Sequence, residues 1–156
     1  MGGEKPSPFG GQMAGVERMN SDRMRTIKEA KLLSADQLHL LWSDGTAATV
    51  PLSANFARAE TPVVGDWGHS VEWPDGSELG ADSLWLDTLT ALGREDARQF
   101  LEWRLRHGLS LAKAAEALGL ARRTVAYYSN GDRSVPKAIL LACRGWEASP
   151  EIRKAA

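Results

Sequence analysis

The sequence contains a single cysteine, Cys143, so the chain cannot form an internal disulfide or a cysteine cluster that binds zinc. Its neighbours in I-L-L-A-C are apolar, which predicts a small buried side chain rather than a nucleophile. None of the three histidines has a second His or Cys at metal-ligand spacing, so we predict no metal site. The sequence also lacks a P-loop, a dinucleotide fingerprint and a G-x-S-x-G elbow. We therefore predict no cofactor and no catalytic residue, and we expect that the protein is not an enzyme.

Long hydrophobic runs are also missing. No apolar run approaches the roughly 18–20 residues that span a bilayer, so we expect no membrane partner. The opening M-G-G-E-K-P-S-P-F-G-G-Q-M-A-G has neither the apolar core nor the basic start of a signal peptide. We expect a cytoplasmic protein with disordered tails at residues 1–22 and 149–156.

The chain has no excess of either charge, because its net charge is only −1, but the charges are unevenly distributed. Residues 22–93 carry five Lys or Arg against eleven Asp or Glu, whereas residues 94–144 carry ten against five. Such asymmetry is typical of a nucleic-acid-binding segment joined to another unit. We predict two domains, an acidic one at 23–93 and a basic one at 94–148.

The acidic part is predicted to be built mainly from strands. Two apolar runs in L-H-L-L-W-S-D-G-T-A-A-T-V-P-L flank Asp44-Gly45, a dipeptide that favours a tight hairpin. The preceding run, residues 27–33, is expected to pair with the first of them. A second turn is expected at Pro74-Asp75-Gly76, where proline presets φ and glycine relieves the turn.

A helix is expected to follow at residues 81–92, because the apolar period changes there from two to about 3.6. Its buried face would contain Leu84, Leu89 and Leu92, and Asp82 or Ser83 is available as an N-cap. The predicted fold of the acidic part is therefore a small α+β domain, an antiparallel sheet with one helix.

Four tryptophans lie in this acidic part: Trp42, Trp67, Trp73 and Trp85. A small sheet-plus-helix core needs bulky aromatic residues to bury enough area, which favours the interpretation that they form the core. The alternative is a stacking pocket for a ligand or a docking surface for a partner, and the spacing does not distinguish the two.

The two turn motifs carry a resemblance. The segments I-K-E-A-K-L-L, L-H-L-L-W-S-D-G-T and V-E-W-P-D-G-S-E-L-G-A-D-S-L-W, within residues 27–86, resemble a family of short bacterial domains of unknown function. That family has a W/F-S-D-G hairpin and a later W-P-D/N-G turn that leads to a helix. The resemblance implies a small α+β domain, found alone or joined to a helix-turn-helix. Some members are encoded beside small toxin-like proteins, which implies an antitoxin-like role.

The basic part is predicted to be helical. Residues 94–107 have the apolar spacing of one helix, and Gly108 suits its C-terminal end. Ser110 is expected to cap a second helix that ends at Gly119, and a third helix follows directly. Two short helices joined by a tight glycine-containing turn are the plan of a helix-turn-helix. A last apolar helix is expected after Pro136 and closes at Gly145.

The third helix is expected to turn Ala121, Val125 and Tyr128 inward. The opposite side would then present candidate base-reading residues, since Arg pairs with guanine, Asn with adenine, and Ala or Tyr can meet a thymine methyl group or the backbone. These candidates are Arg122, Arg123, Ala126, Tyr127 and Asn130. Candidate phosphate contacts are Ser110, Thr124, Arg133 and Lys137.

The segment S-L-A-K-A-A-E-A-L-G-L-A-R-R-T-V-A-Y-Y-S-N-G-D-R-S-V-P closely resembles the lambda-repressor/Cro-like (XRE-type) helix-turn-helix family, including its trailing G-D/E-R-x-V-P. The resemblance covers residues 97–146. It implies a compact all-α bundle of four to five helices that inserts its third helix into the major groove, commonly as a dimer on palindromic sites. Ala121 stands where a capping serine is usual in that family.

Together these features predict a sequence-specific, double-stranded-DNA-binding transcriptional regulator that forms a homodimer. The acidic domain would supply dimerisation, ligand sensing or a surface for a protein partner, and an autoregulating antitoxin is one concrete form. The alternative function is a protein-interaction adaptor that uses the helix-turn-helix as a scaffold and does not bind DNA.

Overall fold

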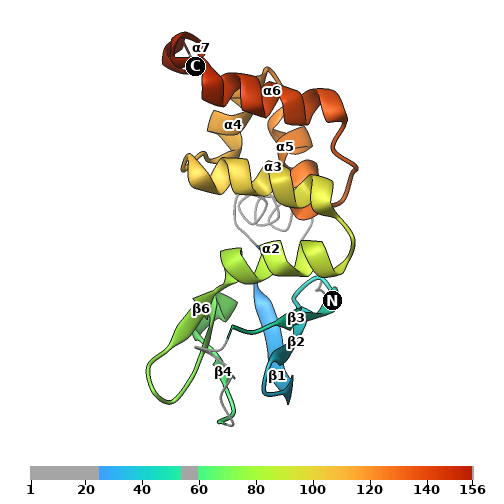
Figure 1. Cartoon of the computed structure of the whole chain (residues 1–156), viewed down its shortest axis with the longest axis vertical. Coiled ribbons are helices and arrows are strands. Elements are labelled where there is room, and N and C mark those ends of the chain that lie inside the picture. The colour runs from blue at the N-terminus through green and yellow to red at the C-terminus, as the bar shows by residue number, and fades with distance from the viewer. Residues whose placement is uncertain (1–24, 54–59, 156) are drawn as a thin grey trace, which may run out of the picture.

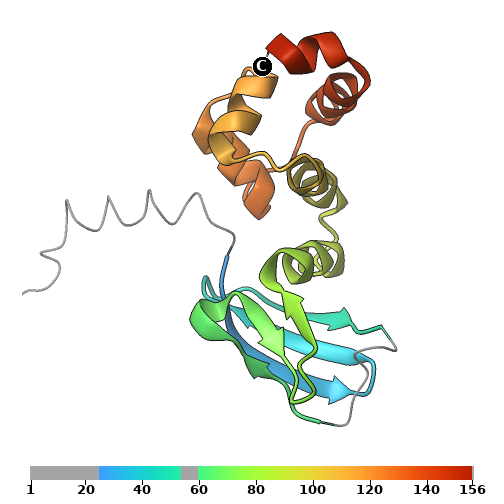
Figure 2. The same ribbon diagram turned by 90° about the vertical axis from the view of Figure 1, so that its left-hand side faces the viewer.

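The computed structural model describes residues 25–53 and 60–155, so the tail expected at 1–22 lies outside the described residues. Strands come first along the chain and helices follow, and the two kinds of element occupy opposite ends of an elongated molecule (Figures 1 and 2). Helices α2 and α3 lie between these ends (Figure 1). An antiparallel sheet region followed by helices agrees with the coarse fold that the sequence predicts.

The first sheet is a three-stranded antiparallel meander with the order β1-β2-β3, namely Ile27–Ser34, Gln37–Trp42 and Ala47–Pro51. The hairpin predicted at Asp44-Gly45 joins β2 to β3, and Gly45 has a φ of 92° that few other residues adopt. The Asp44 carboxylate accepts hydrogen bonds from the Thr46 amide at 3.0 Å and the Thr46 hydroxyl at 2.9 Å. Local turn chemistry therefore sets the register of this hairpin.

The second sheet is also a three-stranded antiparallel meander, formed by β4 Val63–Val64, β5 Ser70–Glu72 and β6 Glu78–Gly80. The turn predicted at residues 74–76 joins β5 to β6. Gly76 has a φ of 90°, and the Asp75 carboxylate accepts a hydrogen bond from the Ser77 amide at 2.9 Å.

Helix α2, Ala81–Ala91, packs across the first sheet and buries Leu84, Trp85 and Leu89. The N-cap prediction of Asp82 or Ser83 is wrong, because β6 runs straight into the helix and Gly80 occupies the N-cap position without a side-chain bond. Leu92 lies beyond the last helical residue and is 46% exposed, so it does not belong to the buried face.

Three of the four tryptophans in the strand-rich part are buried, as the core interpretation predicts. Trp42 and Trp85 meet edge to face with ring centroids 4.9 Å apart, and Trp42 Nε1 donates to Thr88 Oγ1 at 3.1 Å. Trp67 is the exception, since it is 85% exposed and has a φ of 62°. It lies in the short 3-10 segment Asp66–Gly68 (η2), whose backbone, not its tryptophan ring, packs against the start of β1 at Gly68.

Five helices complete the chain, and α3 connects the two hydrophobic clusters. Ala97 and Leu101 of α3 join the cluster of strands and α2, whereas Phe100 and Trp103 join the cluster formed by α4, α5 and α6. The two cores therefore share one helix, and the domain boundary at 93/94 stays a prediction. The bounds of the five helices are α3 Glu95–Arg106, α4 Leu111–Leu118, α5 Arg122–Asn130, α6 Lys137–Ala148 and α7 Pro150–Ala155.

The C-terminal end differs from the prediction in two ways. Helix α6 continues past Gly145 to Ala148, because a single glycine lowers helix stability without ending the helix. The segment 149–156, expected to be disordered, contains α7. The Arg153 guanidinium lies 5.3 Å from the ring centroid of Trp146, a cation–π contact that holds α7 against α6.

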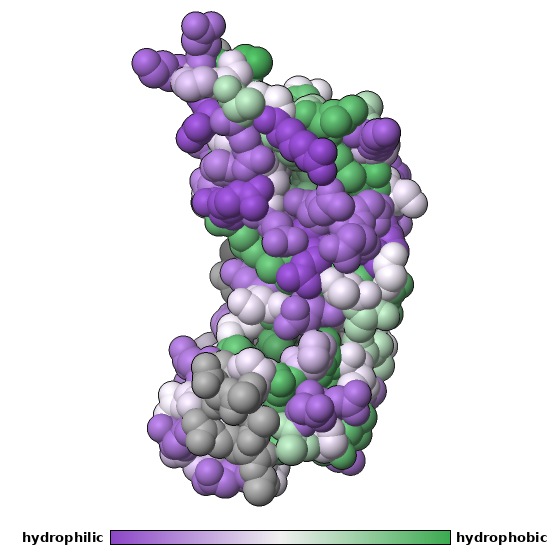
Figure 3. All heavy atoms as spheres, viewed as in Figure 1, coloured by the Kyte–Doolittle hydropathy of each residue, from purple (hydrophilic) through white to green (hydrophobic). Residues whose placement is uncertain are grey.

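Cys143 is buried as predicted, and burial, with a smaller contribution from the charge of Glu147, raises the pKa of its thiol to about 12. In the part of the chain that the structure describes, no helix is both long and apolar enough to cross a membrane. The face in Figure 3 is largely hydrophilic over the helical end, with hydrophobic patches between the polar groups.

Candidate nucleic-acid interface

Helices α4 and α5 form the candidate interface and meet at a tight corner. Ser110 caps α4 as predicted, accepting a hydrogen bond from the Lys113 amide at 3.1 Å. Gly119 ends α4 in the left-handed conformation, with a φ of 69°, and the Leu120 amide donates to the Ala115 carbonyl at 2.9 Å. This arrangement satisfies carbonyl groups at the end of α4 and turns the chain sharply into α5.

The start of α5 has no side-chain cap. Ala121 occupies the N-cap position and is exposed, so the prediction that it faces inward is wrong. Because alanine has no side-chain oxygen, Ala121 cannot cap the first-turn amides of α5. The first two residues of the helix, Arg122 and Arg123, are exposed, and Thr124 is half-buried.

One candidate on α5 is misplaced. Ala126 was expected on the outward side, but it is 9% exposed and belongs to the hydrophobic cluster of the helical end. The physical reason is that α5 packs against both α3 and α4, so it buries Val125, Ala126 and Ser129 over a wide stripe. Ala126 is therefore not available to read a base.

The last turn of α5 presents a stacked pair. The guanidinium carbon of Arg133 lies 4.2 Å from the centroid of the Tyr127 ring, a cation–π contact between two predicted contact residues. Asn130 is half-buried at the end of the helix. Lys137, the first residue of α6, is exposed, as is Lys113 on α4, a cation that the sequence candidates did not include.

A buried arginine of α3 is hydrogen-bonded to the C-terminal half of α5. Arg104 is 7% exposed, and its Nη1 donates to Ser129 Oγ at 2.8 Å while its Nε donates to the Leu109 carbonyl at 3.1 Å. Burial lowers the pKa of this guanidinium, and the charge of Asp82 opposes that effect. An arginine keeps its charge throughout, so these are charge-assisted bonds.

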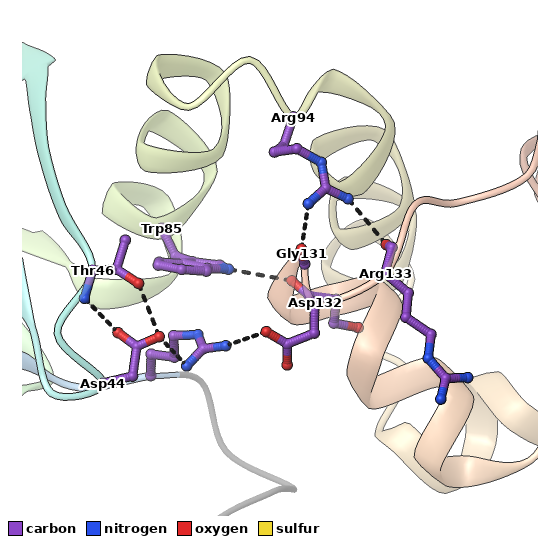
Figure 4. A network of polar contacts seen from close by, with 9 residues as sticks. Asp44, Thr46, Trp85, Arg94, Gly131, Asp132 and Arg133 are labelled. Atoms are coloured by element: carbon purple, nitrogen blue, oxygen red, sulfur yellow. Dashed lines mark hydrogen bonds and ion pairs between the residues drawn. The ribbon is translucent and has the colours of Figure 1, made fainter.

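The loop that follows α5 is held by the start of α3. Arg94 donates to the carbonyl oxygens of Gly131 and Arg133, the latter at 3.0 Å (Figure 4). The Asp96 carboxylate accepts from the Val135 amide at 2.7 Å and pairs with Arg94 at 3.3 Å. Burial alone would raise the pKa of Asp96, but hydrogen bonds from Arg94 and two backbone amides, with the charge of Arg94, lower it. These contacts give the G-D-R-S-V-P segment a fixed path.

A second set of contacts reaches the same loop from the strands. The Arg25 guanidinium pairs with Asp44 at 2.5 Å and with Asp132 at 3.1 Å (Figure 4). It also lies 5.0 Å from the centroid of the Trp85 ring. Trp85 Nε1 in turn donates to the Ser129 carbonyl at 3.2 Å. Residues from the strand-rich part and from α2 thus contact the C-terminal end of α5 and the loop that follows it.

Sequence reasoning did not identify the residues that support α5. Arg25 and Asp132 are 107 positions apart, so no local pattern connects them. Arg104 lies on a helix with other arginines, and composition does not show which one is buried. Asp96 is an acidic residue in the first turn of a helix, which predicts only a favourable dipole interaction.

Within residues 25–53 and 60–155, no group of three or more His, Cys, Asp or Glu side chains is arranged to hold a metal ion.

No protein-family model matches the chain, and no curated protein matches it. Among solved structures, the chain is similar to the crystal structure of a protein from Nitrosomonas europaea ATCC 19718 that is described as a candidate DNA-binding protein. The two chains share 31% sequence identity with a TM-score of 0.54, over 80% of this chain and 87% of that chain. A match of that length includes strands as well as helices.

Proposed function

The chain belongs to the same family as this candidate DNA-binding protein from Nitrosomonas europaea, and on that premise we propose that it binds double-stranded DNA as a sequence-specific transcriptional regulator. Helix α5 is the proposed recognition helix and enters the major groove. The observation that carries the proposal is the α4–Gly119–α5 corner, which leaves two exposed arginines at the start of a helix whose other end is fixed.

The proposed base contacts come from the exposed and half-buried side chains of α5. Arg122 and Arg123 have the fork of donors that pairs with the O6 and N7 atoms of guanine, and Asn130 has the amide that pairs with adenine. The Tyr127 ring, with the Arg133 guanidinium over its face, can meet a thymine methyl group or the backbone. Ala126 is no longer a candidate, because it is buried.

Phosphate contacts are proposed around this helix. Arg133 and Lys137 follow α5 along the chain, Ser110 is the N-cap of α4, and Thr124 lies in the first turn of α5. The Ser110 hydroxyl accepts from the Lys113 amide, so its own hydrogen is available to a phosphate oxygen. The uncapped amides of α5 suit the same kind of ligand.

Selection of bound duplexes from a random library, with the full chain, tests the proposal directly. We expect an enriched motif, and affinity that falls steeply between about 50 and 200 mM salt because condensed counterions are released. A library without enrichment, with equal weak affinity for all duplexes, would refute sequence-specific regulation. If the chain bound no duplex at all but bound a protein partner tightly, that result would instead support the adaptor function.

Three variants separate base reading from phosphate binding. Arg123→Ala should cost about 1–3 kcal/mol on the selected duplex and relax the preference at one base pair. Lys137→Ala should weaken all duplexes alike. Arg106→Ala is the matched control, because it removes the same charge from an exposed site on α3 that pairs with Glu147 at 2.9 Å. Equal losses from Arg123→Ala and Lys137→Ala would show that α5 does not read bases.

Homodimerisation belongs to the same proposal. Leu141 on α6 and Ile152 on α7 are 51% and 52% exposed, and such apolar side chains suit a contact between two copies. A dimer would select palindromic sites with half-sites one helical turn apart. Enrichment of single, asymmetric sites would argue against it. An antitoxin role, with a protein partner on the strand-rich part, would require that such a partner changes the affinity for the selected duplex.

A further inference from the structure

We propose that Arg25 is a positioning residue for DNA reading, through which the strand-rich end of the molecule sets the placement of α5. The inference rests on the proposed function, because it assigns a role in recognition to a residue outside the helix-turn-helix. Arg25 precedes β1, whereas the loop it contacts follows α5.

The geometry around Arg25 is that of a bridge. Its guanidinium joins two carboxylates from opposite ends of the chain, Asp44 in the β2–β3 turn and Asp132 after α5 (Figure 4). The Arg25 side chain is only 16% exposed, and it lies over the face of Trp85. The planar fork of arginine can hold two carboxylates at once, which the point charge of a lysine does less well.

Asp132 belongs structurally to α5. Its backbone amide donates to the Tyr127 carbonyl at 2.9 Å, and this bond closes the C-terminal end of the helix. The next residue is Arg133, which stacks on Tyr127. A shift of Asp132 therefore moves both members of the stacked pair, which are proposed DNA contacts.

The indole of Trp85 adds a second contact from the same side. By donating to the Ser129 carbonyl, it satisfies an acceptor in the last turn of α5. The N-terminal end of α5 has no comparable side-chain cap. Arg25, through Asp132, and Trp85 therefore add contacts at the C-terminal end of α5 to the packing of this helix on α3 and α4.

The test compares Arg25→Gln with Lys28→Gln in the full chain. Both variants remove one positive charge near the start of β1, but Lys28 is exposed and lies outside the contacts to α5. The first readout is the ratio of affinities for the duplex selected by the wild-type protein and for a scrambled duplex of the same length. A ratio removes the uniform electrostatic effect of a changed charge. The second readout, which needs no DNA, is amide hydrogen exchange of residues 129–135, with amides of α4 as an internal reference for global stability.

We expect Arg25→Gln to lower the affinity ratio roughly two- to fivefold, the size that a partly exposed ion pair can transmit. The same variant should speed exchange in residues 129–135 but not in α4, and Lys28→Gln should change neither readout. Adding Asp132→Asn to Arg25→Gln should produce no further change, since both members of the pair are then already lost.

The inference is overturned if Arg25→Gln behaves like Lys28→Gln, or if exchange rises while the affinity ratio stays constant. A wild-type protein that prefers no duplex would instead refute the proposed function. In that case faster exchange in Arg25→Gln would still identify a mechanical link, but its role in DNA reading would fall with the function.

Discussion

The buried Arg104 allows a quantitative test of what holds α5 in place. Replacement by methionine keeps a long unbranched stem but removes the two donors that reach Ser129 Oγ and the Leu109 carbonyl. Hydrogen bonds to charged groups contribute about 1.5–3 kcal/mol each. Removal of the charge also removes the cost of keeping a guanidinium out of water, which offsets part of this loss. We therefore expect Arg104→Met to lower the free energy of unfolding by about 2–4 kcal/mol.

The matched control is Arg106→Met, two positions further along α3. The Arg106 side chain is 56% exposed and its ion pair with Glu147 faces solvent. Exposed pairs of this kind contribute about 0.2–1 kcal/mol, so this variant should cost little. The same helix thus contains one arginine whose loss should matter and another whose loss should not.

Urea unfolding at pH 7 and 25 °C, followed by far-ultraviolet circular dichroism, measures both variants. The double variant Arg104→Met/Ser129→Ala should cost less than the sum of the single changes, because the two side chains share one hydrogen bond. Additive costs, or a loss below about 1 kcal/mol for Arg104→Met, would refute the view that this contact anchors α5.

Further predictions concern single positions. The pKa of Asp96 is lowered in the folded chain, so its contribution is present above the unfolded pKa of about 3.9 and is lost as pH falls through the folded value. In Asp96→Asn the free energy of unfolding should therefore fall less than in the wild type below about pH 4, and urea unfolding at pH 3 and pH 6 measures it. The same difference between the two pH values in both proteins would contradict this prediction. Trp67→Gly should give a more stable protein than Trp67→Ala by about 1 kcal/mol, because alanine keeps the left-handed strain at a φ of 62°. Equal melting temperatures for these two variants would show that the strain is absent. Gly119→Ala, at a φ of 69°, should destabilise by about 1–2 kcal/mol, whereas Gly145→Ala, inside α6 with open space around its Cβ position, should stabilise by about 0.5–1 kcal/mol. Melting temperatures that shift in the same direction in Gly119→Ala and Gly145→Ala would contradict this prediction.

Features with a local cause were predictable from the sequence. The hairpin at Asp44-Gly45 and the left-handed end of α4 at Gly119 follow from the conformations that glycine alone adopts easily. The Ser110 cap follows from the hydrogen bond that a serine oxygen offers to a helix amide. Each depends on a few neighbouring residues, so a single sequence contains the information.

Features that depend on distant packing were not predictable. Ala126 is buried because α5 meets two helices, and Trp67 is exposed because its loop presents backbone to β1. Helix α7 is short and polar, and its contact with Trp146 could not be read from the sequence of the tail. The bridge from Arg25 to Asp132 joins residues 107 positions apart.

The acidic strands and the basic helices lie at opposite ends of the molecule. This separation of charge affects how the molecule approaches a polyanion, before the two touch. Among the described residues, 25–53 and 60–93 carry three Lys or Arg against ten Asp or Glu, whereas 94–155 carry twelve against seven. Because these two parts lie at opposite ends of the molecule (Figure 1), it has an electric dipole along its length. The field of a polyanion exerts a torque on this dipole that turns the helical end toward the polyanion and the strand-rich end away from it. Such orientation during approach raises the fraction of productive encounters, an effect on the association rate that falls with ionic strength. A chain whose overall charge is almost zero can therefore still approach a polyanion with its basic end first, while its acidic end faces away.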